Sequence, residues 1–288
     1  MGLVNMDEML QSAKHDGRAV GAFNVLDYNS MRAVVQAAED LESPVIVQTS
    51  VKTVEFWGAS AMVDWARELA GRSRCPVALH LDHCRCVAFA EQCIEAGWTS
   101  VMIDGSFEPF ERNLADTKRV SDVARKAGAS VEAELGTIVG VEDDSAVLGA
   151  DAHLADPAQA QEFCAQLHLS AFAPAIGTAH GIYKGEPKIA FDRLGEIARS
   201  TGVPIALHGG TGLSENVFRR CIALGCAKIN ISTALKHAFV DGFVEPHLAQ
   251  PKYDPLKLLD TQFEWVRALV CENVRLFGAR ERSPQPPR

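Results

Sequence analysis

Eight short apolar segments recur along the chain, and most are separated by a stretch with helical periodicity. Their apolar residues are continuous rather than alternating, which indicates strands that are buried on both faces. The strand segments lie at residues 19–26, 43–50, 76–84, 100–106, 130–136, 171–180, 204–210 and 227–233. Apolar spacing of three and four predicts helices at residues 30–41, 60–71, 87–97, 113–128, 156–167, 192–202 and 214–225. This alternation is typical of an α/β protein with a parallel sheet.

Eight such strands within 288 residues predict a single-domain (β/α)8 TIM barrel. A doubly wound open sheet is the alternative. It needs fewer strands and usually a glycine-rich turn after the first, where this chain has FNVLDYNS. We expect the barrel domain to span residues 1–278, with a helical C-terminal extension at 241–277 that caps the barrel or reaches a partner subunit. The charged, proline-rich residues 279–288 are expected to form a disordered tail.

Charge and cysteine content narrow the class of protein. The formal net charge is −9, which disfavours binding to nucleic acid or to an anionic membrane. The N-terminus lacks a basic leader with an apolar core, and no apolar run approaches the ~20 residues that span a bilayer. We therefore expect a cytoplasmic enzyme with reduced cysteines. The spacing of Cys84, Cys86 and Cys93 matches no standard zinc pattern, so we interpret them as small buried side chains.

Polar side chains stand at the ends of the predicted strands, where a core strand would be apolar. They are Asp82, His83, Asp104, Ser106, Glu132, Glu134, His180, His208, Asn230, Ser232 and Thr233. In a barrel all of these strand ends meet at the C-terminal face, where active sites of this fold are built. The sequence therefore predicts one polar site at that face.

Three of the strand-end residues are histidines. Neutral imidazole is a good zinc ligand, and three protein ligands leave a position open for substrate. His83, His180 and His208 are therefore candidate ligands of one metal ion. His80 is interpreted as a structural or supporting strand residue, and Glu132 as a buried or salt-bridged one. The remaining histidines are expected to have ordinary hydrogen-bonding roles.

Two glycine- and hydroxyl-rich segments follow the last two predicted strands. HGGTG at 208–212 and NIST at 230–233 lie where barrels of this type commonly bind phosphate through backbone N–H groups and hydroxyls. A metal ion chelated by a hydroxy-ketone would polarise its carbonyl and stabilise an enediolate, while neighbouring carboxylates move protons. The combination of metal site, carboxylates and phosphate site predicts aldol cleavage or condensation.

Six motifs together resemble, in order and spacing, the class II (metal-dependent) ketose-bisphosphate aldolases. They are HLDHC (80–84), SVMIDGS (100–106), VEAELG (131–136), GTAHGIYKGEPK (177–188), IALHGGTGLSE (205–215) and AKINIST (227–233). The resemblance covers most of residues 1–278. The GTAHG segment and the length are closest to the tagatose-bisphosphate branch, with the shorter fructose-bisphosphate aldolases next.

The resemblance implies a metal centre and a (β/α)8 fold. His83, His180 and His208 match the ligands of a catalytic Zn2+. Asp104 and Glu134 match a second or alternative metal position. A monovalent cation such as Na+ or K+ near Gly181 is also a feature of the family, as is assembly into a homodimer or homotetramer.

The resemblance also implies catalytic and substrate-binding residues. Asp82 matches the acid/base that handles the aldehyde half, and Glu142 matches the mobile-loop acid that exchanges the proton on the dihydroxyacetone phosphate carbon. Positions implied to contact substrate or phosphate are Asn24, Ser50, Gly181, Lys184, Gly209, Gly210, Thr211, Asn230, Ser232 and Thr233. The implied reaction is reversible cleavage of a ketose 1,6-bisphosphate of the fructose or tagatose type to dihydroxyacetone phosphate and an aldehyde such as glyceraldehyde 3-phosphate.

Three positions depart from the family pattern. Cys84 follows His83 where many members have Gly, and Val139 with Gly140 replaces the usual Gly-Gly pair of the mobile loop. Ser232 stands where many fructose-bisphosphate enzymes carry Asp.

Other functions stay open at this point. They are cleavage of another phosphorylated ketose, a metal-dependent isomerase or epimerase, and a non-catalytic barrel subunit of a sugar-phosphate aldolase complex. A Schiff-base aldolase using Lys184 or Lys228 is disfavoured because it would leave three histidines without a role.

Overall fold

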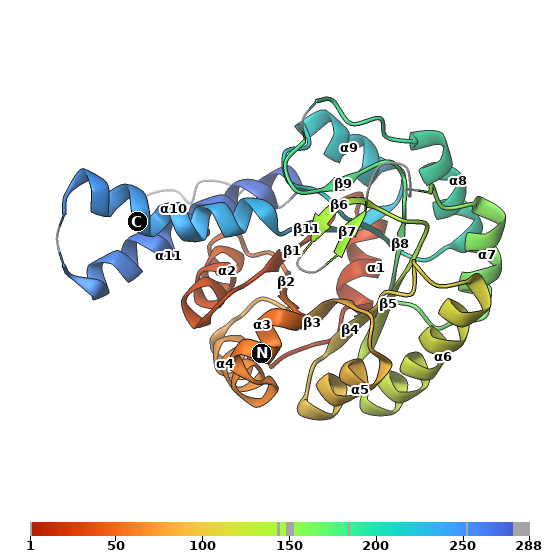
Figure 1. Ribbon diagram of the computed structural model, residues 1–288, viewed down its shortest axis with the longest axis horizontal. Coiled ribbons are helices and arrows are strands. Elements are labelled where there is room, and N and C mark those ends of the chain that lie inside the picture. The colour runs from red at the N-terminus through yellow and green to blue at the C-terminus, as the bar shows by residue number, and fades with distance from the viewer. Residues whose placement is uncertain (1, 143–144, 148–152, 184, 252, 279–288) are drawn as a thin grey trace, which may run out of the picture.

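Eight parallel strands close into a barrel, hydrogen-bonded in the order β1-β11-β10-β8-β5-β4-β3-β2 (Figure 1). The computed structural model describes residues 2–142, 145–147, 153–183, 185–251 and 253–278. The barrel strands are β1 (Val20–Asn24), β2 (Val45–Ser50), β3 (Val77–Cys84), β4 (Ser100–Ile103), β5 (Ser130–Leu135), β8 (Ala171–Pro174), β10 (Ile205–Leu207) and β11 (Cys226–Ile231). The TIM barrel prediction is confirmed. The open-sheet alternative is wrong because β1 pairs with both β2 and β11.

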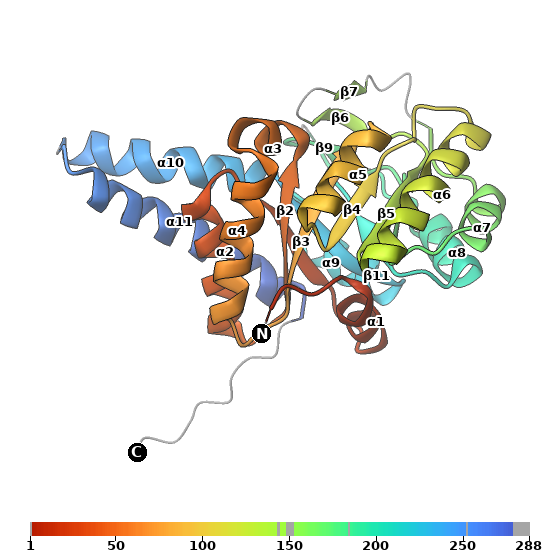
Figure 2. The same ribbon diagram turned by 90° about the horizontal axis from the view of Figure 1, so that it is seen from below.

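Helices between the strands form a ring outside the barrel (Figures 1 and 2). They are α2 (Tyr28–Leu41), α3 (Val51–Trp57), α4 (Ala59–Arg72), α5 (Val87–Ala96), α6 (Phe110–Ala127), α7 (Pro157–Ala165), α8 (Phe191–Thr201) and α9 (Glu215–Ala223). The helices α5 and α6 end at glycines, Gly97 and Gly128, whose left-handed backbone closes the last turn. Within the described part of the chain, no helix is both long and apolar enough to cross a membrane.

Alternate strand residues feed two separate apolar clusters, as the two-residue period of a strand requires. Outward-pointing residues such as Phe23, Val47 and Leu79 join the large cluster beneath the helices. Their neighbours Ala22, Ile46 and Ala78 join a smaller cluster inside the barrel. Burial on both faces explains why these strands read as continuous apolar runs.

The lower opening of the barrel is closed by α1 (Asp7–His15), a helix that the sequence did not predict. Met9, Leu10 and Ala13 of this helix pack with the inner cluster of strand residues. In Figure 2, α1 lies at the end of the barrel opposite β6 and β7. The interior therefore has an apolar layer next to α1, and its polar residues lie beyond that layer.

One predicted strand is wrong in its extent. The segment 171–180 was expected to be the sixth barrel strand ending at His180, but β8 stops at Pro174. Gly177 then turns the chain with φ +93°, where an added Cβ would lie 2.3 Å from the carbonyl oxygen of Lys188. The residues Ala179–His180 form a separate strand, β9, in a three-stranded sheet of order β7-β6-β9. His180 is therefore held by this small sheet and not by the barrel.

The C-terminal extension is a helical hairpin, here called the helical arm. It consists of α10 (Thr233–Ala249) and α11 (Pro255–Leu276), so the predicted helical segment 241–277 begins earlier and is interrupted. The two helices run side by side away from the barrel in both views (Figures 1 and 2). The end of α11 returns to the barrel, where Phe277 packs on Phe218 with ring centroids 5.1 Å apart. The predicted tail at 279–288 lies outside the described residues.

Candidate active site

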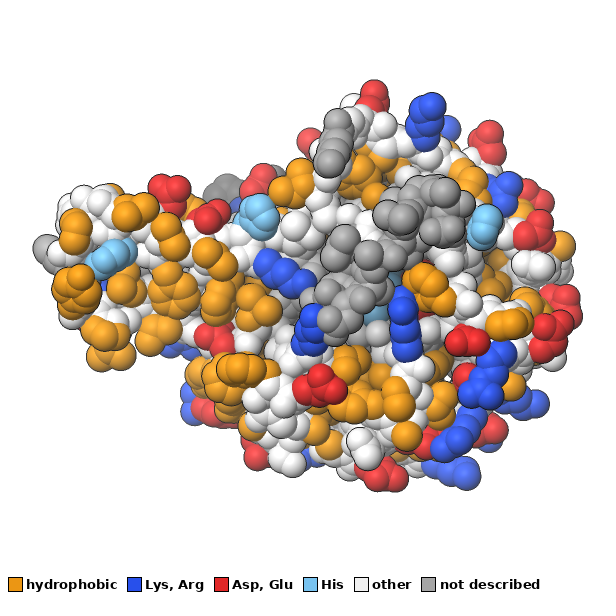
Figure 3. All heavy atoms as spheres, viewed as in Figure 1, with side chains coloured by type: hydrophobic (Ala, Val, Ile, Leu, Met, Phe, Trp, Pro, Cys, Tyr) orange, Lys and Arg blue, Asp and Glu red, His pale blue; other side chains and the backbone are white. Residues whose placement is uncertain are grey.

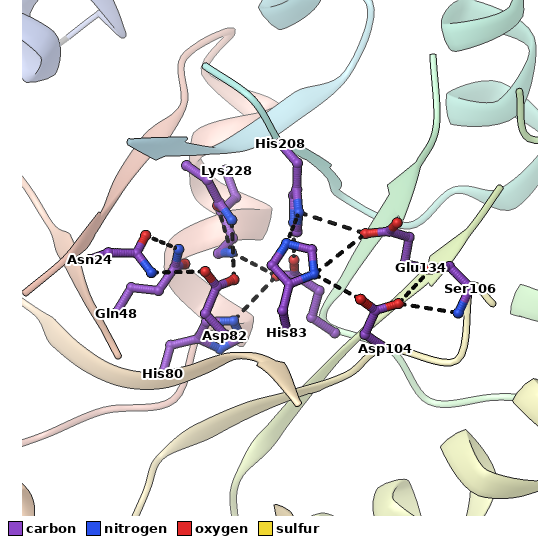
Figure 4. Close-up of polar contacts among 12 residues, drawn as sticks. Asn24, Gln48, His80, Asp82, His83, Asp104, Ser106, Glu134, His208 and Lys228 are labelled. Carbon is purple, nitrogen blue, oxygen red and sulfur yellow. Dashed lines mark hydrogen bonds and ion pairs between the residues drawn. The ribbon is translucent and has the colours of Figure 1, made fainter. Parts of the chain in front are cut away.

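Polar residues from most barrel strands meet at the C-terminal end of the barrel, as predicted. On the first three strands, Asn24 ends β1, Ser50 ends β2, and Asp82 and His83 lie near the end of β3. On the others, Asp104 follows β4, Glu134 lies in β5, His208 follows β10, and Asn230 lies in β11. All of these side chains are buried except that of His83, which is partly exposed. Figure 4 shows most of them pointing toward one another.

The backbone at His83 is unusual. Its φ is +45°, a left-handed conformation that is rare for a residue with a side chain and costs about 1–3 kcal/mol. The pairing of β3 with β4 also shifts in register between Leu81 and Cys84. In a regular strand, Asp82 and His83 would point to opposite faces. The irregularity lets both successive side chains enter the site (Figure 4).

Three imidazoles converge at the centre of the site. The ring centroid of His83 lies 4.6 Å from that of His208 and 5.0 Å from that of His180. One nitrogen from each of the three rings lies within 4.8 Å of the other two. A second group of the same size consists of His83, Asp104 and Glu134. The described residues thus bring together both metal-ligand sets expected from the sequence.

Carboxylates contact His83 and His208 at the outer ring nitrogen, the one that faces away from the other histidine. Nδ1 of His83 lies 2.9 Å from Asp104 and 3.9 Å from Glu134, and Nε2 of His208 lies 2.8 Å from Glu132. Burial alone would raise the pKa of Asp104, but hydrogen bonds from His83 and Ser106 lower it well below its ordinary value. Burial lowers the pKa of His208 against the opposing effect of Glu132. His208 is therefore neutral at neutral pH, as a metal ligand must be.

The donor pattern fits a cation that would be bound by both His83 and His208. An ionised carboxylate only accepts hydrogen bonds, so the outer nitrogen of each ring carries the hydrogen. The inner nitrogens, Nε2 of His83 and Nδ1 of His208, then direct lone pairs toward each other across 2.8 Å. Two facing lone pairs repel each other unless both can interact with a shared positive charge, which a metal ion would supply. A metal-binding histidine commonly donates its other N–H to a carboxylate in this way.

Asp82 is held beside the histidines by amide groups from two other strands. The Asn24 amide donates to Asp82 at 2.9 Å, and the Asn230 amide donates at 3.4 Å. The Gln48 amide donates to Asn24 at 2.8 Å and so fixes which way the Asn24 amide faces. The carboxylate has a defined orientation before any substrate binds.

A fully buried charge pair lies deeper in the barrel. The ammonium group of Lys228 lies 2.9 Å from Glu132 and donates to Asn230 at 2.8 Å. Burial alone would raise the pKa of Glu132, but Lys228 and His208 lower it well below its ordinary value. His80 donates to or accepts from Ser100 at 2.7 Å and lies 3.8 Å from Glu132. As expected, Glu132 is salt-bridged and His80 is a supporting residue.

The predicted phosphate-binding segments lie in the loops after β9, β10 and β11. Gly209 has φ +69°, and an added Cβ there would lie 2.4 Å from the carbonyl oxygen of Ala179. Tyr183 donates to the carbonyl oxygen of Gly209 at 2.8 Å and accepts from the backbone N–H of Ala179. Thr211 accepts from the N–H of Ala234 in the first turn of α10. The predicted positions Gly181, Gly210, Ser232 and Thr233 lie in the same loops or at the start of α10.

The segment that carries Glu142 is tied to a predicted metal ligand. Strand β6 (Val139–Glu142) pairs in parallel with β9, with Gly140 opposite His180, and in antiparallel with β7 (Ser145–Val147). An added Cβ at Gly140 would lie 2.3 Å from the carbonyl oxygen of His180, so only glycine permits this approach. Glu142 therefore lies two residues after Gly140, the residue that pairs with His180. The predicted position Lys184 lies outside the described residues.

Cys84 is not part of either metal-ligand group among the described residues. Its thiol donates to the carbonyl oxygen of Cys86 at 3.2 Å, and burial raises its pKa to about 11. The side chain is therefore a protonated thiol, in agreement with its interpretation as a small buried residue. Cys93 is also buried, but Cys86 is exposed, so its interpretation as a buried side chain is wrong.

Comparison with known proteins identifies the family. The family described as "Fructose-bisphosphate aldolase class-II" matches residues 4–282. The chain belongs to this aldolase family. A probable fructose-bisphosphate aldolase of Bacillus subtilis (strain 168) is 41% identical over 283 residues, which are 97% of this chain and 99% of the relative. A fructose-bisphosphate aldolase of Staphylococcus aureus (strain Mu50 / ATCC 700699) is 40% identical over 288 residues, covering 98% and 100%.

A solved structure agrees with this assignment to the class II aldolases. The crystal structure of the YdjI aldolase from Escherichia coli K12 has a TM-score of 0.85 and 30% identity to this chain. The match covers 96% of this chain and 98% of that one. The resemblance inferred from six sequence motifs is therefore confirmed.

Some residues of this aldolase's site did not emerge from its sequence. The sequence did not indicate Gln48 or Tyr183 as site residues. Gln48 is nevertheless two residues before Ser50 on β2, and Tyr183 lies inside the GTAHGIYKGEPK motif. Both act on neighbours instead of pointing at the histidines: Gln48 orients Asn24, and Tyr183 joins the loop after β10 to β9. Lys228 was considered only as a Schiff-base residue, yet its ammonium group contacts Asn230.

Proposed function

We propose that this chain catalyses the zinc-dependent, reversible aldol cleavage of a ketose 1,6-bisphosphate to dihydroxyacetone phosphate and an aldehyde such as glyceraldehyde 3-phosphate. The observation that carries the proposal is the convergence of three imidazoles beside a pre-oriented carboxylate, Asp82. Two curated relatives bear the name fructose-bisphosphate aldolase, which favours the fructose substrate over the tagatose one.

His83, His180 and His208 would hold the zinc ion. When bound, zinc would supply a Lewis acid for the ketone oxygen of the substrate. Asp104 and Glu134 orient His83 in the described geometry. Together with Nδ1 of the same ring, they would form an alternative metal position. A monovalent cation near Gly181 remains part of the proposal.

Two carboxylates divide the proton transfers in this proposal. Asp82 protonates the carbonyl oxygen of the aldehyde half during condensation and removes the hydroxyl proton during cleavage. Glu142 exchanges the proton on the reacting carbon of dihydroxyacetone phosphate. The two residues lie on different elements, since Asp82 belongs to the barrel strand β3 and Glu142 to the small sheet above the barrel.

Backbone N–H groups and hydroxyls of the loops after β9, β10 and β11 would bind the phosphates. The proposed contacts are Gly181, Lys184, Gly209, Gly210, Thr211, Ser232 and Thr233, with Asn24, Ser50 and Asn230 near the ketose chain. The positive φ of Gly209 and the start of α10 at Thr233 support this role, because exposed N–H groups at a helix start favour anions.

A panel of phosphorylated ketoses tests the proposed activity. We expect fructose 1,6-bisphosphate to give dihydroxyacetone phosphate and glyceraldehyde 3-phosphate, measured in a coupled assay and by mass spectrometry. Tagatose 1,6-bisphosphate is the matched comparison because it differs at a single carbon. Preference for tagatose would reverse the choice of stereochemistry. Formation of an isomeric ketose without three-carbon fragments would contradict aldol cleavage.

We also propose that the chain forms a homodimer or homotetramer through the helical arm. Hydrophobic side chains line the face of the arm that is seen in Figure 3. Val240 and Leu248 on α10 and Leu256 on α11 are 53%, 73% and 74% exposed. An apolar surface of this kind is typical of a protein–protein interface.

Light scattering after size-exclusion chromatography tests the oligomer. We expect a mass of at least twice the 31.1 kDa of one chain, reduced to 31.1 kDa by Leu248→Lys and Leu256→Lys together. Leu154→Lys, at an exposed leucine far from the arm, is the control that should leave the mass unchanged. A monomeric wild-type protein would contradict the proposal.

A further inference from the structure

A buried ion pair, Lys228–Glu132, connects the candidate acid/base Asp82 with the candidate metal ligand His208. Neither member of the pair is itself a candidate metal ligand or acid/base. The Lys228 and Glu132 side chains are both 0% exposed, and their charged groups lie 2.9 Å apart. Charged groups are seldom fully buried because they lose their hydration, and replacing such a pair by apolar residues often stabilises a protein. Stability alone is therefore a weak reason for this pair to be inside the barrel.

Each member of the pair has a second contact that leads to the site. Glu132 uses its other oxygen to accept from Nε2 of His208 at 2.8 Å. Lys228 donates to the amide oxygen of Asn230 at 2.8 Å, and the amide nitrogen of Asn230 donates to Asp82 at 3.4 Å. One continuous path of polar contacts therefore runs from the acid/base candidate to a candidate metal ligand.

The chemical nature of each group fixes the direction of these contacts. Lys228 has only donors, so Asn230 must turn its oxygen to Lys228 and its NH2 group toward Asp82. The Glu132 carboxylate has only acceptors, so the hydrogen of His208 must lie on Nε2. Nδ1 is then left with its lone pair toward His83. Both orientations are those that the proposed aldolase requires.

We propose that the Lys228–Glu132 pair is a positioning device that sets the metal-binding tautomer of His208 and the amide orientation of Asn230 together. This inference rests on the proposed metal site. The charged group of Glu132 contacts the three-histidine cluster only at the outer nitrogen of His208, and that of Lys228 does not contact the cluster. Both act through another side chain and are positioning residues, not catalytic ones.

Glu132→Gln is the sharpest variant because it keeps the shape of the side chain. A glutamine amide can either donate or accept, so His208 is no longer obliged to carry its hydrogen on Nε2. We expect the Kd for Zn2+ to rise about 10–100-fold, the effect typical of losing a hydrogen-bonding partner of a metal ligand. The measurement is competition of purified, metal-stripped protein with a chromophoric chelator, and it needs no substrate.

The double variant Lys228→Met/Glu132→Gln separates positioning from stability. It removes both buried charges, so it should unfold at a higher temperature than Lys228→Met alone. Zinc affinity should nevertheless stay as weak as in Glu132→Gln. A folded double variant that binds zinc as tightly as the wild type would overturn the proposal, and so would wild-type affinity in Glu132→Gln. If Lys228→Met does not fold, these two variants still decide the question.

Controls keep this test apart from the test of the proposed activity. Glu91→Gln removes a carboxylate that pairs with Arg119 on the outside of the barrel, and zinc affinity should not change. Zinc affinity is measured without turnover, so a protein that cleaves no ketose bisphosphate can still confirm the role of the pair. Conversely, an active aldolase with unaltered zinc affinity in Glu132→Gln would reject the pair alone.

Discussion

Removal of the metal is expected to abolish aldol cleavage. Lewis-acid stabilisation of a developing charge is worth several kcal/mol, and about 4 kcal/mol corresponds to about a thousandfold in rate. Dialysis against a chelator should therefore reduce kcat at least about a thousandfold, and added Zn2+ should restore it. The assay is cleavage of fructose 1,6-bisphosphate with metal content measured on the same sample.

Single histidine variants assign that loss to the proposed ligands. His180→Ala is the most informative, because His180 lies on β9, outside the barrel strands. Each of His83→Ala, His180→Ala and His208→Ala should bind less zinc and lose cleavage activity. His15→Ala is the matched control, since His15 lies at the end of α1 with a side chain that is 88% exposed. Full activity in metal-free protein would reject the metal-dependent mechanism.

The sequence predicted the barrel because each of its strands is buried on two faces. Continuous apolar runs and apolar spacing of three and four are local signals, and they located the eight strands and most of the helices. Two helices lacked such signals. The segment Val51–Trp57 contains β-branched residues directly after β2, and only Ser50, which accepts from the N–H of Thr53, marks a helix start. The nine residues of α1 are held by packing across the barrel floor.

The sequence predicted that His83, His180 and His208 converge, but for a partly incorrect reason. His180 was expected at the end of a barrel strand, but the turn at Gly177 removes it from the barrel, and pairing with β6 brings it back to the site. No local pattern predicts that pairing, because it joins segments far apart in the chain. The motif match located His180 where periodicity could not.

The interior polar network was also beyond local prediction. Glu132 and Lys228 each look like an isolated charge in an apolar strand, and their partnership depends on barrel closure. The same closure brings the amides of Asn24 and Asn230 to the two carboxylate oxygens of Asp82. Sequence reasoning can propose that a buried charge is paired, but the identity of its partner comes from the arrangement of the strands.

Replacement of Asp82 by asparagine is expected to reduce cleavage strongly while leaving the metal site intact. General acid–base catalysis contributes about 10²–10⁴-fold, so kcat for fructose 1,6-bisphosphate should fall by about that factor. Asparagine has nearly the same shape and can still accept from Asn24. Asp82 belongs to neither metal-ligand group, so zinc content should stay at the wild-type level.

A partial reaction shows which proton Asp82 moves. In the proposed division of roles, Glu142 exchanges the proton on dihydroxyacetone phosphate and Asp82 serves only the aldehyde half. Asp82→Asn should therefore still exchange that proton with deuterated solvent, as followed by NMR, although it no longer cleaves the ketose. Glu142→Gln should lose both activities. Asp64→Asn, at an exposed position on α4, is the control that should retain both. Equal loss of exchange and cleavage in Asp82→Asn would show that Asp82 acts on both halves of the substrate.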